Sequence, residues 1–436
     1  MKFFLRKRFL ALVLLFVTAV YSFDGIDLAL VRKSFISLQS LQQFGTLAYV
    51  GREAGRYVDN LFLMKRLGEL PKEDIQAFLR QRRAHDRPVQ SERADRKPNI
   101  VILQMESIEA NALNAQLDGK YVMDFMRKLA GEKLYFDNVI DQAAGGRTSD
   151  AEFLVLTSQV PLRDAPVYTS QDLSIVPSLP KALNEAGYRT VSMHGYKGEF
   201  WNRKNNHRKL GFQESYFLED MENEERLGWG VSDFAAVDRS LDLVESSEEP
   251  LFLFTVLLTS HHPYNYVRHE FKLEDRGIVH DYLYSLSYVD DAIERFFVGM
   301  EERGLLEDTI VIVYGDHDSG LGGGLNNHVT ELVDAADGVQ EILFVAHGLS
   351  ESGKMSRPFG LQDVGPTLLN EIGVPVPGTF VGNHFSVDHS ILLPSNRTVE
   401  RVAGNDFILG SAPVDLQYMA LLAMHKPDDL TTGGDE

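Results

Sequence analysis

The chain has 436 residues, enough to bury a sizeable core in one large α/β domain or in two smaller domains. It contains no cysteine, which excludes disulfides, thiolate nucleophiles and thiolate metal ligands. Its formal net charge of −20 argues against a nucleic-acid-binding protein.

The N-terminus has the pattern of an exported or membrane-anchored protein. An uncharged run from Phe9 to Phe23 follows four basic residues, Lys2, Arg6, Lys7 and Arg8. Two alternatives remain open: a single anchor retained within residues 1–30, which we favour, or a signal peptide cleaved near Val17-Thr18-Ala19. Both place the bulk of the chain outside the cytoplasm, in the periplasm or on the outer face of the cell membrane.

Residues 31–97 are expected to connect this segment to the rest of the chain. Apolar residues recur at helical spacing between Val31 and Leu70, which predicts juxtamembrane helices. Pro71 to Pro98 is dominated by charged residues, and we interpret it as a solvated linker. Contact of its arginines with lipid headgroups is the alternative.

Residues 98–390 alternate between strand and helix patterns. Continuous apolar runs, typical of buried parallel strands, occur at Asn99–Gln104, Arg189–Met193, Leu251–Leu257, Thr309–Tyr314 and Glu341–Val345. Helical patterns lie between and after them, at Tyr121–Ala130, Ser178–Glu185, Phe234–Ser246, Tyr282–Glu302 and Asp363–Ile372. This alternation predicts an α/β catalytic domain with a mostly parallel central sheet and helices on both faces. The pattern then fades, so residues 391–436 are expected to form a C-terminal extension that ends in a frayed acidic tail.

A loop at residues 145–153 predicts a helix start with a free hydroxyl group. Two adjacent glycines permit a sharp turn, and Ser149-x-x-Glu152 matches a capping box with Ser149 as the N-cap. Thr148 would then lie just outside the helix, facing the positive end of the helix dipole, where an anion such as phosphate is stabilised. Arg147 beside it adds a positive charge. An ordinary loop-to-helix junction is the alternative.

Polar side chains follow three of the predicted strands. Glu106 follows the first strand, His261 follows the third, and Asp316 and His317 follow the fourth. Open α/β sheets bind ligands outside the carboxyl ends of their strands, so we expect these groups to converge with Thr148.

Together, Glu106, Asp316, His317 and the Thr148 hydroxyl would form a metal site rich in oxygen ligands. Such a site suits Mn²⁺, Mg²⁺ or Zn²⁺. A metal there would favour the threonine alkoxide and make it a usable nucleophile. The alternative for Asp316-His317 is a loop histidine beside a capping aspartate.

Five motifs follow one another between Asn99 and Ser386: Met105-Glu106-Ser107, residues 146–153, Phe200-Trp201-Asn202-Arg203, Ser260-His261-His262-Pro263-Tyr264 and Tyr314-Gly315-Asp316-His317. Together they resemble the lipoteichoic acid synthase-type phosphoglycerol transferases, membrane-anchored members of the alkaline phosphatase/sulfatase superfamily. The resemblance implies a single Mn²⁺ held by the four metal-site residues, with Thr148 as nucleophile. It also implies that Trp201, Arg203 and His261 contact a glycerophosphate headgroup. From the residues alone, a surface stacking pair and a loop histidine are the alternatives.

The chain departs from this family in three places. The synthases usually have several membrane spans, whereas this sequence shows at most one. Asp318 and the Gly322-Gly323-Gly324 run replace the usual residues after the Asp-His pair. Sulfatases proper need C/S-x-P/A-x-R, and Ser178-Leu-Pro180-Lys-Ala182 lacks the arginine, so sulfatase activity is not expected.

The expected function is that of an extracytoplasmic, metal-dependent phosphoglycerol transferase. Thr148 would attack an anionic phospholipid donor resembling phosphatidylglycerol and pass the phosphoglycerol group to a polymer, a glycan or water. One alternative keeps the site but uses water as acceptor, as a phosphodiesterase or phosphatase does. The other is a non-catalytic envelope assembly protein.

Overall fold

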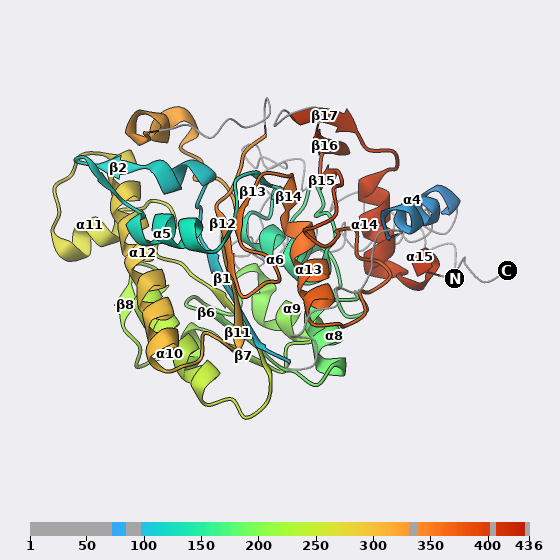
Figure 1. Cartoon of the computed structure of the whole chain (residues 1–436), viewed down its shortest axis with the longest axis horizontal. Coiled ribbons are helices and arrows are strands. Elements are labelled where there is room, and N and C mark those ends of the chain that lie inside the picture. The colour runs from blue at the N-terminus through green and yellow to red at the C-terminus, as the bar shows by residue number, and fades with distance from the viewer. Residues whose placement is uncertain (1–71, 84–96, 331–338, 402–406, 432–436) are drawn as a thin grey trace, which may run out of the picture. The chain divides into compact units, whose positions relative to one another are not determined.

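A computed structural model describes residues 72–83, 97–330, 339–401 and 407–431 (Figure 1). Pro71–Glu436 forms one compact unit. The expected anchor and the juxtamembrane helices fall within residues 1–70, outside the described residues. Within the described ranges, no helix combines the length and the apolar character that crossing a bilayer requires.

An eight-stranded sheet lies at the centre of this unit, in the order β13-β4-β12-β11-β1-β10-β6-β7. Five neighbouring strands are parallel: β11 (Thr309–Gly315), β1 (Asn99–Met105), β10 (Leu251–Val256), β6 (Arg189–His194) and β7 (Glu214–Tyr216). The remaining three are β12 (Phe344–His347), β4 (Leu134–Phe136) and β13 (Gly353–Met355). The prediction of a mostly parallel sheet is confirmed.

One predicted strand differs in position and direction. The structure starts β12 at Phe344 instead of Glu341, and β12 runs antiparallel to both β11 and β4. Glu341 and Ile342 instead form isolated bridges with Ile140 and Glu109. A short apolar run indicates burial but carries no information about strand direction.

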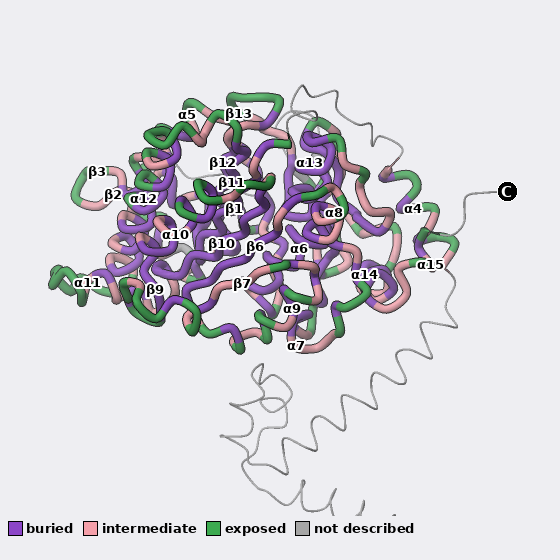
Figure 2. The backbone as a smooth tube through the Cα atoms, turned by 90° about the horizontal axis from the view of Figure 1, so that it is seen from below, coloured by how far each residue is buried: buried purple, intermediate pink, exposed green. Residues whose placement is uncertain are grey.

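The two faces of the sheet pack against different helices. Ile100 and Ile102 of β1 point to one face, into a core shared with α6 (Thr148–Thr157), α8 (Leu179–Glu185) and α13 (Val364–Glu371). Val101 and Leu103 point to the opposite face, toward α5 (Asp124–Glu132), α10 (Asp233–Glu245) and α12 (Ile278–Glu302). Because successive strand residues alternate in direction, one apolar strand serves both cores. Figures 1 and 2 show these helix layers around the buried strands.

Residues interpreted as linker and extension contain regular structure. Within the charged linker, α4 (Glu73–Arg83) buries Ile75 and Leu79, and Lys72 pairs with Asp429 at 2.5 Å. The C-terminal residues form a three-stranded sheet and two helices: β15 (Ile391–Leu393), β16 (Arg397–Arg401), β17 (Phe407–Ser411), α14 (Leu416–His425) and α15 (Asp428–Thr431). The interpretation of residues 73–83 as a solvated linker is therefore wrong, because one side of α4 is buried.

Shorter elements complete the unit: β2 (Gln116–Leu117), β3 (Lys120–Tyr121), β5 (Val139–Ile140), α7 (Val167–Ser170), α9 (Arg203–Lys209), β8 (Arg226–Leu227), β9 (Gly230–Val231), α11 (Tyr266–Phe271) and β14 (Phe359–Gly360). Short 3₁₀ helices occur at Ala110–Asn114, Phe200–Asn202, Leu218–Asp220, Gly322–His328 and Leu361–Asp363.

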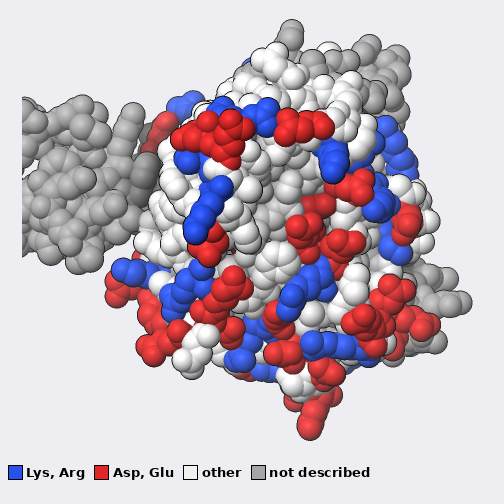
Figure 3. Space-filling view, turned by 90° about the vertical axis from the view of Figure 1, so that its left-hand side faces the viewer, with Lys and Arg blue, Asp and Glu red and all other residues white. Residues whose placement is uncertain are grey.

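Charges of both signs are interspersed on the face shown in Figure 3. Exposed ion pairs join α10 to α12 and to the residue that follows it: Arg295 pairs with Asp238 and Arg303 with Glu245, each at 2.6 Å. Pairs of this kind contribute little to stability, typically about 0.2–1 kcal/mol.

Candidate active site

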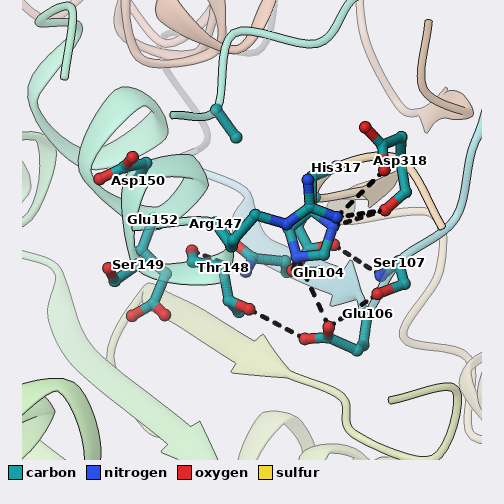
Figure 4. Close-up of polar contacts among 12 residues, drawn as sticks. Gln104, Glu106, Ser107, Arg147, Thr148, Ser149, Asp150, Glu152, His317 and Asp318 are labelled. Carbon is teal, nitrogen blue, oxygen red and sulfur yellow. Dashed lines mark hydrogen bonds and ion pairs between the residues drawn. The ribbon is translucent and has the colours of Figure 1, made fainter. Parts of the chain in front are cut away.

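The predicted metal-site residues converge at the carboxyl edge of the sheet. Figure 4 labels three of them, Glu106, Thr148 and His317. Glu106 follows β1, and Asp316 and His317 follow β11, its parallel neighbour. Thr148 is the first residue of α6, and its hydroxyl donates a hydrogen bond to Glu106 Oε2 at 3.0 Å. All four residues are buried. Adjacent parallel strands bring their carboxyl ends together, which explains the convergence.

Three of these side chains fit a metal ion. The ligand atoms of Glu106, Asp316 and His317 all lie within 4.8 Å of one another. Asp316 Oδ2 and His317 Nε2 are buried and make no hydrogen bond within the described part of the chain. His317 Nδ1 donates to the carbonyl of Asp318 at 2.8 Å, which leaves the lone pair of Nε2 directed at the two carboxylates. Buried atoms without partners are what a bound cation would satisfy.

The electrostatics of the cluster also favour a cation. Burial raises the pKa of Asp316 well above its ordinary value, and the charge of neighbouring Glu106 raises it further. Burial also raises the pKa of Glu106, but interactions led by that with His317 outweigh it and leave this pKa below its ordinary value. Burial lowers the pKa of His317, favouring the neutral imidazole that binds metals. Two carboxyl groups held this close repel each other when both are ionised, and a cation would relieve that repulsion.

The helix that carries Thr148 starts differently from the prediction. Thr148 lies inside α6, and the N-cap residue is Arg147, which makes no side-chain cap. Ser149 Oγ donates to the carbonyl of Gly146 at 2.9 Å, so it does not cap the helix. The predicted capping box is wrong because the Glu152 carboxylate is bonded to two other buried side chains, Arg203 and His207.

Asp150 organises the loop before α6, which sequence reasoning missed. Its Oδ2 accepts hydrogen bonds from the backbone N–H groups of Ala144 at 3.0 Å and Gly146 at 2.8 Å. Burial raises the pKa of Asp150 to about 7. These bonds hold Arg147 at φ 47° and ψ −117°, a conformation that costs a non-glycine residue roughly 1–3 kcal/mol. The sequence signal for this role was the position of Asp150, four residues after Gly146 at the start of a predicted helix.

A pocket of about 370 Å³ adjoins Thr148 and the metal-site residues. Trp201 and His261, which were predicted to bind the headgroup, line this pocket together with Thr148. The full lining is Glu106, Ser107, Arg147, Thr148, Phe200, Trp201, His261, His262, Tyr264, Ile278, His317, Ser319, Gly320 and Leu321. A lining that combines charged groups with aromatic and apolar side chains suits a small polar headgroup attached to an apolar molecule.

The orientation of His261 is set by its neighbours. Its Nδ1 donates to the carbonyl of His262 at 2.7 Å, which leaves Nε2 as the ring nitrogen for a ligand. Its ring packs against Trp229, with the ring centroids 4.2 Å apart. Trp229 lies in the turn between β8 and β9 and was not predicted to be near the site. Its position between Gly228 and Gly230 indicated a turn but not its partner.

Arg203 is placed differently from the prediction. It is 1% exposed and is not among the pocket-lining residues. Its guanidinium donates to Glu152 Oε1 from Nε at 3.0 Å and from Nη2 at 2.6 Å. Glu152 also bonds His207 Nε2 at 2.8 Å. In this structure the Arg203 guanidinium makes its two-point contact with Glu152, and contact between Arg203 and a headgroup stays a prediction.

The fold and the site together define a class of protein. The Thr148 hydroxyl, at the start of α6, lies beside Glu106, Asp316 and His317. These groups lie at the carboxyl edge of a mostly parallel sheet that is covered by helices. The chain belongs to the Sulfatase family, whose model matches residues 98–374. This match, together with the curated relatives that follow, confirms the family resemblance inferred from the motifs, and those relatives are enzymes.

Curated relatives extend this similarity. Lipoteichoic acid synthase 2 of Bacillus subtilis (strain 168) is 29% identical over 329 residues, covering 71% of this chain and 49% of that protein. Lipoteichoic acid synthase of Staphylococcus aureus (strain USA300) is 26% identical over 318 residues, covering 69% and 49%. The chain therefore spans about half the length of these relatives.

Solved structures share the fold. The lipoteichoic acid synthase LtaP from Listeria monocytogenes superposes with a TM-score of 0.63 at 19% identity, covering 77% of this chain and 93% of that one. The Streptococcus pyogenes phosphoglycerol transferase GacH, solved with sn-glycerol-1-phosphate, gives a TM-score of 0.50 at 20% identity, covering 71% and 84%.

Proposed function

We propose that this protein is a metal-dependent phosphoglycerol transferase that uses Thr148 as its nucleophile. The observation that carries the proposal is the Thr148 hydroxyl, bonded to Glu106 at 3.0 Å within a pocket that also contains His317. The similarity to lipoteichoic acid synthases and to a phosphoglycerol transferase supports the same reaction class.

The proposed reaction has two half-reactions that conserve atoms and charge. Thr148 Oγ forms a bond to the phosphorus of a phosphatidylglycerol-like donor, and the bond from phosphorus to the lipid alcohol breaks. The departing alcohol takes up a proton that balances the one lost by Thr148. In the second half-reaction, an acceptor hydroxyl takes the phosphoglycerol group and Thr148 regains its proton.

Glu106, Asp316, His317 and Thr148 Oγ would hold one divalent ion, Mn²⁺ in preference to Mg²⁺ or Zn²⁺. Such an ion would supply charge neutralisation on the phosphoryl oxygens and would favour the threonine alkoxide. The chain's own residues orient the reactants: the position of Thr148 at the start of α6 fixes its hydroxyl beside Glu106.

The headgroup pocket would select the glycerol part of the donor. Trp201 offers an apolar surface to the glycerol carbons, and His261 Nε2 is the ring nitrogen left to bond a glycerol hydroxyl. The acceptor would be a polymer or glycan hydroxyl, with water as the acceptor in the hydrolase alternative.

The donor is a membrane lipid, so we also propose that residues 1–30 anchor the protein with its catalytic domain outside the cytoplasm. A reporter active only in the cytoplasm, fused after Glu436, should be silent in cells. A strong reporter signal would contradict this topology.

A substrate comparison tests the proposed reaction. Phosphatidylglycerol, a phosphate monoester and an aryl sulfate are offered to the full chain at equal concentration, with Mn²⁺ present. We expect clear preference for phosphatidylglycerol, and weaker preference after Trp201→Ala. Preference for the sulfate would overturn the transferase proposal, and equal rates on both phosphates would indicate a phosphatase without a headgroup pocket.

A further inference from the structure

Arg147 is the one arginine or lysine among the described residues that line the pocket. It lies directly before Thr148, and its carbonyl accepts hydrogen bonds from the N–H groups of Asp150 at 2.9 Å and Ala151 at 3.1 Å. Its backbone is therefore part of the first turn of the helix that carries the candidate nucleophile. Its side chain lines the same pocket as Thr148.

A second loop holds the Arg147 side chain in place. Its Nη2 donates to the carbonyl of Asp318 at 2.8 Å and to Asp318 Oδ1 at 3.1 Å. Figure 4 shows the side chain running from the start of α6 to the loop after β11. The same carbonyl accepts the bond from His317 Nδ1, and the N–H of Asp318 donates to Asp141 Oδ2 at 3.0 Å. Arg147 is thus held by the loop that also carries two candidate metal ligands.

Most of the hydrogen-bonding capacity of Arg147 remains available to a ligand. A guanidinium group has five N–H donors, and both bonds to Asp318 come from Nη2. Nε and Nη1 bond no other described residue, and the side chain is 42% exposed. A planar guanidinium that is fixed on one side suits two-point contact with the non-bridging oxygens of a phosphodiester.

We propose that Arg147 is a further catalytic residue, which binds the non-bridging phosphoryl oxygens, and that Asp318 is its positioning residue. The inference rests on the proposed transferase function. Negative charge grows on those oxygens as Thr148 Oγ bonds to phosphorus, so a fixed cation there stabilises the transition state more than the bound donor. The Arg147–Asp318 pair occurs where the sequence departs from the resembling family, since Asp318 follows the Asp-His motif.

Four variants of the full chain test this assignment: Arg147→Ala, Arg147→Lys, Asp318→Asn and the surface control Arg295→Ala. Steady-state rates are measured with phosphatidylglycerol in detergent micelles and Mn²⁺, together with bound metal and melting temperature. Loss of Arg147 should lower kcat about 100-fold or more, the scale found for removing one oxyanion donor, with a smaller change in KM. Arg147→Lys should retain part of this activity, because the charge remains without the planar fork. Asp318→Asn should fall between Arg147→Lys and wild type.

A binding measurement separates contact with phosphate from an indirect effect. The affinity for sn-glycerol 1-phosphate is measured by calorimetry in Thr148→Ala, with and without Arg147→Ala. We expect binding to weaken by about tenfold, the scale of one charge-assisted contact. Unchanged kcat and unchanged affinity after Arg147→Ala would overturn the inference, as would loss of bound metal from that variant. Full turnover by Thr148→Ala would instead overturn the proposed function, so the two failures are distinguishable.

Discussion

Asp316 Oδ2 and His317 Nε2 are buried polar atoms without a hydrogen-bond partner in the described part of the chain, and a bound cation would account for both. The sequence predicted this cluster because polar residues directly followed strands β1 and β11, and the carboxyl ends of parallel strands share one edge of the sheet. It could not predict the partner of Arg203. That depends on how α9 packs against α6, and packing of distant helices leaves no local pattern.

The first prediction concerns the metal. Glu106→Gln, Asp316→Asn and His317→Ala should each lower bound divalent metal and activity. A second replacement should add little to the first, because the three residues act as one unit. Metal content is measured by elemental analysis of the purified proteins. Glu371→Gln is the control, since Glu371 is also a buried carboxylate bonded to a histidine, His384, at 3.1 Å. Wild-type metal content in all three site variants would show that these residues bind none.

The second prediction concerns the buried ion pair between Glu152 and Arg203, both at most 1% exposed. Burial raises the pKa of Glu152, but the charge of Arg203 and the bond from His207 outweigh this and lower the pKa to about 2. Removing the carboxylate leaves a buried cation unpaired. Glu152→Ala should therefore lower the free energy of unfolding by about 3–5 kcal/mol. Glu245→Ala, which breaks the exposed pair with Arg303, should cost much less, because solvent screens that pair. The free energies of unfolding are measured by urea denaturation. Equal losses in Glu152→Ala and Glu245→Ala would contradict the role of burial.

At the scale of elements, the start of α6 shows where local sequence rules fail. A capping box was predicted because Ser149 and Glu152 have the right spacing. Tertiary contacts override that pattern, since Glu152 is bonded to Arg203 and Asp150 binds the preceding loop. The helix expected at Ser178–Glu185 is α8, and there a local cap does form: Ser178 Oγ accepts the N–H of Lys181 at 3.4 Å.

The third prediction compares two adjacent glycines in that loop. A Cβ at Gly146 would lie 2.1 Å from Asp150 Oδ1, whereas at Gly145 the nearest atom is the carbonyl oxygen of Arg163, at 4.0 Å. Gly146→Ala should displace Asp150, lower the melting temperature and reduce activity, because the start of α6 carries Thr148. Gly145→Ala should behave like wild type. The loop would be more tolerant than proposed if both variants kept full activity and stability.

The fourth prediction concerns pH and helix α5. Asp290 of α12 accepts bonds from the N–H groups of Phe125 at 2.8 Å and Met126 at 2.9 Å, at the start of α5. Burial raises the pKa of Asp290 from 3.8 to about 7. Between about pH 4 and 7 the folded protein therefore binds more protons than the unfolded chain. Stability from this group is fully present below about pH 4 and is lost as pH rises to about 7.

Asp290→Asn removes this titration while keeping the shape of the side chain. The free energy of unfolding of wild type, relative to this variant, should fall between about pH 4 and 7 and stay constant above pH 8. Urea denaturation at a series of pH values measures it. A difference that does not vary with pH would contradict the assignment.

At the scale of the whole molecule, the alternation of apolar strands with helices was sufficient to predict a mostly parallel central sheet, but not its short strands β4, β7 and β13. The direction of β12 was not predictable, because its apolar run resembles the runs that form the parallel strands. The packing of α4 beside α15 was also missed, since both are short and rich in charged residues. What the sheet achieves is the convergence of side chains that lie far apart in the sequence, Glu106, Thr148 and His317, at one edge.

The central claim is that Thr148 forms a covalent bond to phosphoglycerol. The most direct measurement is peptide mass spectrometry of the full chain after incubation with phosphatidylglycerol and Mn²⁺. We expect one phosphoglycerol group on the peptide that contains residues 147–149, located at Thr148, and the same adduct in Ser149→Ala. Thr148→Ala should carry none and should not turn over the lipid. An adduct on another residue, or undiminished turnover by Thr148→Ala, would contradict the mechanism.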